Sequence, residues 1–157
     1  MNDNMPWSER IGAAAFYLIP LIESLDFAAF IFRDVPALQL LFVPLVPVIQ
    51  IYEAIPLGRL IVFFGIFFGV VRNDRFSDFI RFNAMQALLV SIILSISGFL
   101  LSLLGPSVGS IPLLFETIIN TLFLGVLAIA IYSMVQSVRG ERAEIPAISE
   151  AADLQSR

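Results

Sequence analysis

The sequence predicts an all-α, polytopic membrane protein: a four-helix transmembrane bundle with an extra proline-broken interfacial or re-entrant segment. Hydrophobic residues make up 59% of the 157 residues and charged residues only 14%, and the mean hydropathy is +0.92. Soluble domains carry roughly 25% charged residues, and a soluble fold of this size cannot enclose so much apolar surface. Several apolar stretches also approach or exceed the about 20 residues that a helix needs to cross a bilayer.

The first predicted span covers residues 11–32 and follows a short polar N-terminus over residues 1–10. It contains Pro20, Glu23 and Asp26, and the two acids, three positions apart, share one helical face. The N-terminus lacks the Arg- and Ser-rich stretch of a transit peptide, and no small-residue cleavage site follows the apolar run. We therefore expect an uncleaved signal anchor here.

The next apolar stretch, residues 35–53, is the proline-broken segment. Pro44 and Pro47 remove backbone hydrogen bonds that lipid cannot replace, and Gln50 and Glu53 end the apolar run early. We expect an interfacial or re-entrant segment. A second predicted span, residues 54–71, follows it and is rich in Phe and Gly.

The C-terminal half contains two clear spans, predicted over residues 83–104 and 111–135. The turn between them is rich in Gly, Pro and Ser, as is typical of a short connection between antiparallel helices. The membrane domain thus extends over residues 11–138, and a polar tail over residues 139–157 completes the chain.

The distribution of arginine suggests which loops lie on the cytoplasmic side, because positive residues concentrate there. With four spans, one side holds most of the arginines, namely Arg10, Arg72, Arg75, Arg81, Arg139, Arg142 and Arg157, and Arg33 and Arg59 lie opposite. With five spans, Arg33 replaces Arg10 in the majority, so the rule does not choose between the two topologies. Both place the loop with Arg72, Arg75 and Arg81 and the tail inside.

Small residues form a stripe along the span over residues 83–104. Small side chains let helix backbones approach each other in a membrane, so the stripe predicts either helix packing or a smooth groove along which a polypeptide slides. The GIFFG sequence of the second span gives the same expectation. The predicted packing residues are Gly65, Gly69, Ala84, Ala87, Ser91, Ser95 and Gly98.

Polar side chains within or near the spans are the other candidates, because an acid at the bilayer centre costs roughly 2.5–3.5 kcal/mol. Glu23 and Asp26 are the intramembrane acidic candidates, and they either mark a span end or handle ions. Near helix ends, the polar side chains that could line a hydrophilic path are Asn83, Gln86, Glu116 and Asn120.

The composition also excludes several classes of chemistry. The chain has no His, Cys or Lys, so zinc fingers, thiol chemistry, His-based triads, Schiff bases and P-loops are ruled out. We expect no enzyme activity, cofactor or metal site. The net charge of −4 gives no reason to expect a nucleic-acid partner. In the Arg-rich loop, Phe76, Phe79 and Phe82 are expected to anchor in the lipid headgroups. The alternative is that this loop is a docking site for a partner or for an incoming chain.

Several motifs together resemble the Tic20 family, the small multi-pass subunit of the protein translocon at the chloroplast inner envelope, which has cyanobacterial homologues. The similar stretches are Tyr17–Glu23, Arg59–Asn73, Phe79–Ala87 and Ala143–Pro146 in this order. The resemblance covers about residues 10–155. It implies four membrane helices, both termini on the stromal or cytoplasmic side, and a role in moving precursor proteins.

The resemblance thus predicts a channel-forming or channel-associated translocon subunit with lipid, other subunits or further copies of itself, and precursor polypeptides as partners. A member from a cyanobacterium would lie in the plasma membrane, and one from a plastid-bearing organism in the chloroplast inner envelope. Two other functions stay open at this stage. One is a small ion or solute carrier that uses the intramembrane carboxylates, and the other is a non-conducting assembly scaffold.

Overall fold

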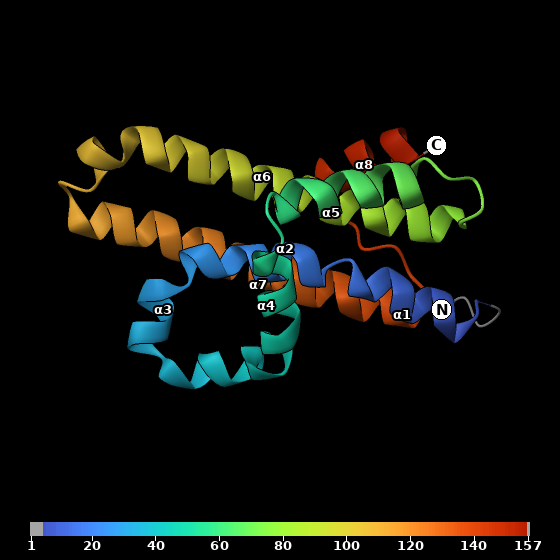
Figure 1. The fold of residues 1–157 in the computed structure, drawn as a ribbon, viewed down its shortest axis with the longest axis horizontal. Helices are drawn as coiled ribbons and strands as arrows, with labels where there is room; N and C mark the ends of the chain where they lie inside the picture. The colour runs from blue at the N-terminus through green and yellow to red at the C-terminus, as the bar shows by residue number, and fades with distance from the viewer. Residues whose placement is uncertain (1–4, 157) are drawn as a thin grey trace.

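The computed structural model describes residues 5–156, apart from the side chains of Pro106 and Val108, and every regular element in that range is helical. Two long antiparallel helices, α6 (Asp78–Val108) and α7 (Pro112–Arg139), form a hairpin along the longest axis of the molecule (Figure 1). Among the described residues, three helical stretches are long and apolar enough to cross a membrane, namely Pro36–Ala54, Asp78–Gly105 and Pro112–Arg139. The fold is therefore that of an all-helical, polytopic membrane protein.

Both hairpin helices extend beyond their predicted limits, α6 at its N-terminus and α7 at its C-terminus, because each has a capping residue there. The Ser77 hydroxyl oxygen accepts a hydrogen bond from the Ile80 backbone N–H at 3.4 Å and starts α6. Gly140, with a φ of 77°, adopts the left-handed conformation that closes α7. These capping residues lie outside the apolar runs, so hydropathy alone could not locate the ends of the two helices.

The predicted span over residues 11–32 is not one continuous helix. It consists of α1 (Trp7–Ala15), α2 (Leu18–Glu23), η1 (Ser24–Phe27) and α3 (Ala29–Asp34), which follow one another beside α7 (Figure 1). Pro20 has no N–H to donate, and the chain tightens just before it, where Tyr17 N–H bonds to the Ala14 carbonyl. Further on, the Ser24 hydroxyl donates to the Leu21 carbonyl at 2.6 Å. Such a side-chain hydrogen bond competes with the backbone hydrogen bonds of a continuous helix.

Residues 35–54 form a side loop made of the 3-10 helix η2 (Pro36–Leu45) and α4 (Val46–Ala54). Figure 1 shows that the chain changes direction sharply between them, although the stretch is long enough for a span. Pro44 lies inside η2 and Pro47 in the first turn of α4. One buried side chain, Phe42, ties the side loop to the core, with its ring centroid 6.1 Å from that of Phe123 in α7.

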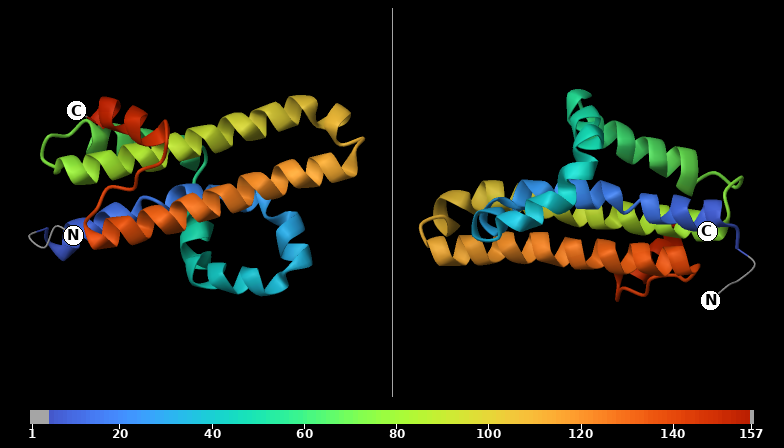
Figure 2. Two further views of the ribbon diagram at one scale, coloured as in Figure 1. Left: turned by 180° about the vertical axis from the view of Figure 1, so that it is seen from behind. Right: turned by 90° about the horizontal axis from the view of Figure 1, so that it is seen from below.

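The second predicted span begins later than expected, at α5 (Gly58–Ile66), and continues into the π-helical turn η3 (Phe67–Val71). Residue 54 instead ends α4, and residues 55–57 make a turn in which Leu57 has a φ of 57°. The helical stretch Gly58–Val71 is apolar but is only about 21 Å long at 1.5 Å per residue. Figure 2 shows that η3 approaches α6, whereas the start of α5 diverges from the bundle.

The polar tail contains a helix that the sequence did not predict, α8 (Ile148–Ser156), which packs on the first half of α6. The start of α1, the loop 72–77 and α8 lie at the same end of the hairpin, which we call the inner end; the turn between α6 and α7 lies at the outer end (Figure 1). Phe79 and Phe82 are buried here rather than in lipid headgroups, because α6 already begins at Asp78 and turns them toward α1 and α8.

Candidate functional site

A buried polar cluster at the inner end joins three helical segments. The Tyr17 hydroxyl and the Ser137 hydroxyl each donate to Asn83 Oδ1 at 2.9 Å, and Asn83 Nδ2 donates to the Phe79 carbonyl at 2.8 Å. Tyr17, Asn83 and Ser137 are each 0% exposed. Asn83 therefore cross-links the α1–α2 junction, α6 and α7 from inside the bundle.

Gln86, one turn further along α6, holds the C-terminal tail. Its Nε2 donates to the Ala143 carbonyl at 3.2 Å and to the Ser149 hydroxyl at 3.4 Å. The Ser149 hydroxyl also donates to the Ala143 carbonyl and accepts from the Ile145 N–H at 2.6 Å. These bonds fold residues 143–149 back onto α6.

At the outer end, Arg33 at the close of α3 forms an ion pair with Glu116 at the start of α7, with 2.9 Å between Nη2 and Oε1. Asn120 lies one turn further along α7, and its buried Oδ1 has no hydrogen-bond partner among the described residues. The four polar residues predicted to line a path are therefore divided. Asn83 and Gln86 lie at the inner end with partners inside the chain, and Glu116 and Asn120 lie at the outer end.

A second polar cluster lies midway between these ends and brings together residues that are far apart in the sequence. Glu23 is 6% exposed, and its Oε1 accepts a hydrogen bond from the Tyr52 hydroxyl at 2.5 Å. Asp26 forms an ion pair with Arg59 at 2.7 Å between Oδ2 and Nη2. The two intramembrane acidic candidates thus each have a partner, Tyr52 in the last turn of α4 and Arg59 in the first turn of α5. Neither partner was among the predicted site residues.

This central cluster borders a cavity of about 270 Å³, which Arg59 in the first turn of α5 helps to line. The cavity wall is formed by Glu23, Asp26, Phe27, Arg59, Leu94, Ser95 and Gly98. Leu94 and Ser95 lie near the middle of α6, so the cavity is at mid-depth of the hairpin. The second carboxylate oxygen of Glu23, Oε2, is buried and has no hydrogen-bond partner among the described residues.

The predicted small-residue stripe on α6 meets different surroundings along its length. Ala84, Ala87 and Ser91 are buried in the inner half. Ser95 and Gly98 border the central cavity, and a Cβ atom at Gly98 would lie 3.4 Å from the Phe27 ring. The stripe therefore packs at the inner end and opens into a cavity at mid-depth.

Gly65 in α5 and Gly69 in η3 form no contact with another helix among the described residues. Both are exposed, and a Cβ atom at either position would meet no heavy atom of another described segment within 4 Å. Their exposure shows that this face of α5 and η3 points away from the bundle. A contact at these glycines requires another molecule.

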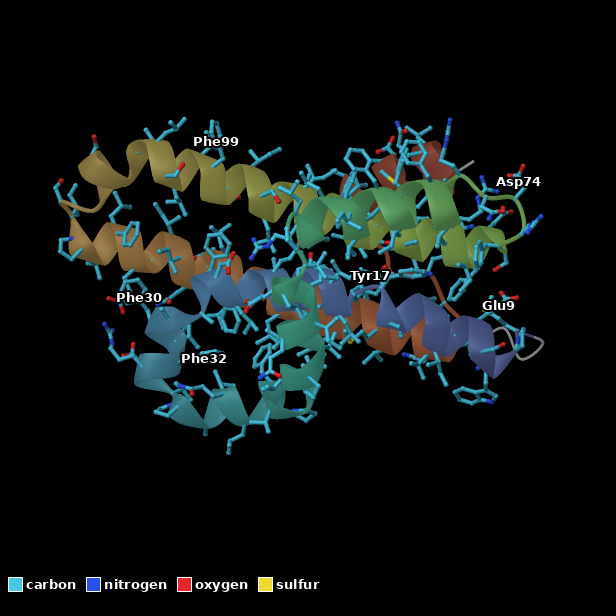
Figure 3. The ribbon with its side chains drawn as sticks, viewed as in Figure 1. Glu9, Tyr17, Phe30, Phe32, Asp74 and Phe99 are labelled. Atoms are coloured by element: carbon cyan, nitrogen blue, oxygen red, sulfur yellow. The ribbon has the colours of Figure 1, made fainter. Side chains whose placement is uncertain are left out.

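In the Arg-rich loop, Arg72 and Arg75 are exposed, whereas Arg81 is largely buried. Its Nε donates to the Val71 carbonyl at 2.9 Å, and its Nη1 lies 3.3 Å from Asp74 Oδ1. Arg81 thus fixes the turn between η3 and α6. Figure 3 shows Asp74 and Glu9 at the same inner end, where Glu9 accepts a hydrogen bond from the Ser77 hydroxyl at 2.6 Å.

Comparison with known proteins identifies the family. Residues 1–152 match the family described as "Chloroplast import apparatus Tic20-like". A Tic20 family protein of Synechocystis is 42% identical over 99% of this chain and 98% of its own length. The chloroplastic protein TIC 20-II of Arabidopsis thaliana is 33% identical over 96% of this chain and 73% of its own length. The Tic20 family protein Ycf60 of Gracilaria tenuistipitata var. liui is 34% identical over 94% of this chain and 74% of its own length. The chain belongs to the Tic20 family.

Proposed function

We propose that this chain is a membrane subunit of a protein translocon and that it works in an assembly with other membrane subunits or with further copies of itself. The observation that carries the proposal is the match of residues 1–152 to a family described by its part in chloroplast import. The 42% identity to the Synechocystis protein favours the plasma membrane of a cyanobacterium as its location.

The proposed topology has four crossings, with α6 and α7 as the two long spans. The other two crossings are the segment α1–α3 beside α7 and a return crossing in which α5–η3 spans the inner half, from the mid-depth cluster at Arg59 to the inner end. The side loop over residues 35–54 enters from the outer end and brings the chain back to mid-depth without crossing by itself. This topology places both ends of the chain on the cytoplasmic side together with the exposed Arg72 and Arg75. The positive-inside rule favours that side for the Arg-rich loop and for the tail.

The packing supports a path formed beside the chain rather than through it. Tyr17, Leu88 and Phe123 fill the bundle interior and are at most 1% exposed. A bundle of this size is solid when packed in this way, so conduction would need surfaces from several subunits. The role requires helix contacts and gating, and no bond chemistry.

The exposed glycine face of α5 is the proposed contact with the neighbouring subunit. Gly65→Leu with Gly69→Leu would place bulk on that exposed face, where an added Cβ atom meets no other described segment within 4 Å. Gly125→Leu on α7 is the matched control, because that glycine also has open space around it. We expect the double variant to lose co-purifying membrane partners or copies and Gly125→Leu to keep them.

Two results would contradict this account at different levels. If the double variant retains all its partners, the contact on α5 is wrong. If the wild-type chain, purified from its native membrane in mild detergent, carries no other membrane protein and no second copy, the translocon role itself fails.

A second candidate function, transport of an ion or small solute, is favoured by the buried Glu23 beside a mid-depth cavity. Carriers commonly build midplane sites where membrane helices are interrupted. The test is a flux measurement in liposomes with the wild type and with Glu23→Gln combined with Asp26→Asn. Flux through the wild type that disappears in the double variant would favour the carrier, whereas unchanged flux would remove these acids from it.

A further inference from the structure

We propose that the mid-depth cavity is a binding site for a primary ammonium group, supplied by a lysine side chain of another membrane-embedded polypeptide. The proposal rests on the proposed function only for the source of the ammonium group, namely a partner subunit or a chain in transit. The cavity and its charge are properties of this chain alone.

The cavity wall carries a net negative charge, which favours binding of a cation. Glu23 and Asp26 bring two carboxylates, and Arg59 brings one guanidinium, which is already paired with Asp26. One formal negative charge is therefore left at Glu23, near the middle of the membrane domain. Such a charge is costly without a partner, and Glu23 Oε2 has none among the described residues.

The available acceptors favour an ammonium over a guanidinium. Glu23 Oε1 already accepts the Tyr52 hydroxyl, so only Oε2 is free, and a two-pronged guanidinium contact would need both oxygens. Glu23 forms part of the cavity wall, so its carboxylate is within reach of an ammonium group that enters the cavity. Ser95 offers a hydroxyl acceptor and Phe27 an aromatic ring in the same wall.

The size and composition of the cavity argue against a bare metal ion. No group of three or more His, Cys, Asp or Glu side chains able to hold a metal was found among the described residues. A volume of about 270 Å³ also exceeds what one ion needs and accommodates an alkyl chain against Leu94 and Gly98. Because the sequence contains no lysine, the ammonium group must come from another molecule.

The test uses the full-length protein in liposomes with a fluorescent transmembrane peptide of Leu and Ala that carries one central Lys. A second peptide has Gln at the same position. Association is measured by energy transfer to a dye on the C-terminal tail. We expect the Lys peptide to associate about tenfold more tightly than the Gln peptide, a difference typical of one buried charge contact.

Glu23→Gln removes the charge but keeps the shape and an acceptor for Tyr52, and it should abolish the preference for Lys. Ser95→Leu fills the cavity from an exposed position and should abolish it as well, which guards against a folding defect in the first variant. Glu116→Gln, an acid at the outer end, is the matched control and should keep the preference.

Equal association of the Lys and Gln peptides with the wild type would overturn the inference, and so would a preference that survives Glu23→Gln. Addition of free butylammonium separates the chemistry from its source. Competition by butylammonium supports the ammonium site directly. A Lys preference that resists saturating butylammonium places the recognition outside the cavity and contradicts the proposal. Failure of these binding tests leaves the co-purification result for the translocon untouched, so the two proposals fail separately.

Discussion

Asn83 accepts hydrogen bonds from both Tyr17 and Ser137 at 2.9 Å, and all three side chains are fully buried. One amide oxygen thereby connects the N-terminal segment with both helices of the hairpin. Buried polar groups are stabilising when each has a partner and costly when one is removed. The inner end of the molecule is therefore held by polar contacts as well as by apolar packing.

Asn83→Ala should lower the free energy of unfolding by about 1–3 kcal/mol, because it leaves the Tyr17 and Ser137 hydroxyls without their acceptor. Reversible unfolding in mixed detergent micelles measures the change. Asn120→Ala is the matched control, since its Oδ1 has no partner to lose among the described residues. Equal destabilisation by the two variants would show that the Asn83 contacts contribute nothing specific.

Gly58→Ala should disturb the connection between α4 and α5. A Cβ atom there would lie 2.6 Å from the Tyr52 carbonyl oxygen, which is backbone and cannot swing aside. We expect a loss of about 1–3 kcal/mol of unfolding free energy, as for other strained backbone sites. Gly65→Ala, in open space, should be neutral or stabilising by up to about 1 kcal/mol through helix propensity. A neutral Gly58→Ala would contradict the turn geometry.

Gln86→Leu should release the C-terminal tail while the hairpin remains folded, because the variant removes the hydrogen bonds to Ala143 and Ser149. Hydrogen exchange measured over residues 143–156 should become faster. Gln39→Leu, an exposed substitution of the same kind on η2, should leave that exchange unchanged. Identical protection of the tail in both variants would count against its attachment through Gln86.

A pH effect is expected at the outer end. A hydrogen bond from the Arg33 guanidinium, supported by its charge, holds the pKa of the Asp34 carboxyl below its ordinary value. The stabilisation from this pair is complete above the ordinary pKa of aspartate and is lost as the pH falls through the lowered pKa. Arg33→Gln should therefore raise the Asp34 pKa in an NMR titration. Arg139→Gln, at the inner end, should not change it, and an unchanged titration in Arg33→Gln would disprove the pairing.

The sequence was most informative where one local pattern decides the structure. The long apolar runs over residues 83–104 and 111–135 identify the hairpin, and Pro44 and Pro47 mark the segment that bends away. The breaks between α1 and α3 were less visible, because one proline and one serine–carbonyl bond interrupt an otherwise apolar stretch. The helix α8 has no apolar face strong enough to predict it, and its position depends on contacts with α6.

In the candidate site too, the sequence identified individual residues but not the partners they contact. Glu23 and Asp26 could be recognised as unusual from their apolar surroundings. Their partners Tyr52 and Arg59 could not, since a bent side loop of unpredictable course brings them close. Asn83 and Gln86 were likewise recognised as polar residues in a span, but their partners lie in α7 and the tail. These contacts could not be predicted because the partners are more than 50 residues away in the sequence.

The central claim, that this chain is part of a protein translocon, is tested most directly by photocrosslinking in the native membrane during transport of an arrested precursor. Probes at Ser95 and Asn120 report on the cavity and the outer end, and a probe at exposed Ile93 reports on the lipid-facing surface of α6. We predict crosslinks from Ser95 or Asn120 to the precursor or to other translocon subunits, and none of these from Ile93. Crosslinks to lipid alone at all three positions would contradict the claim.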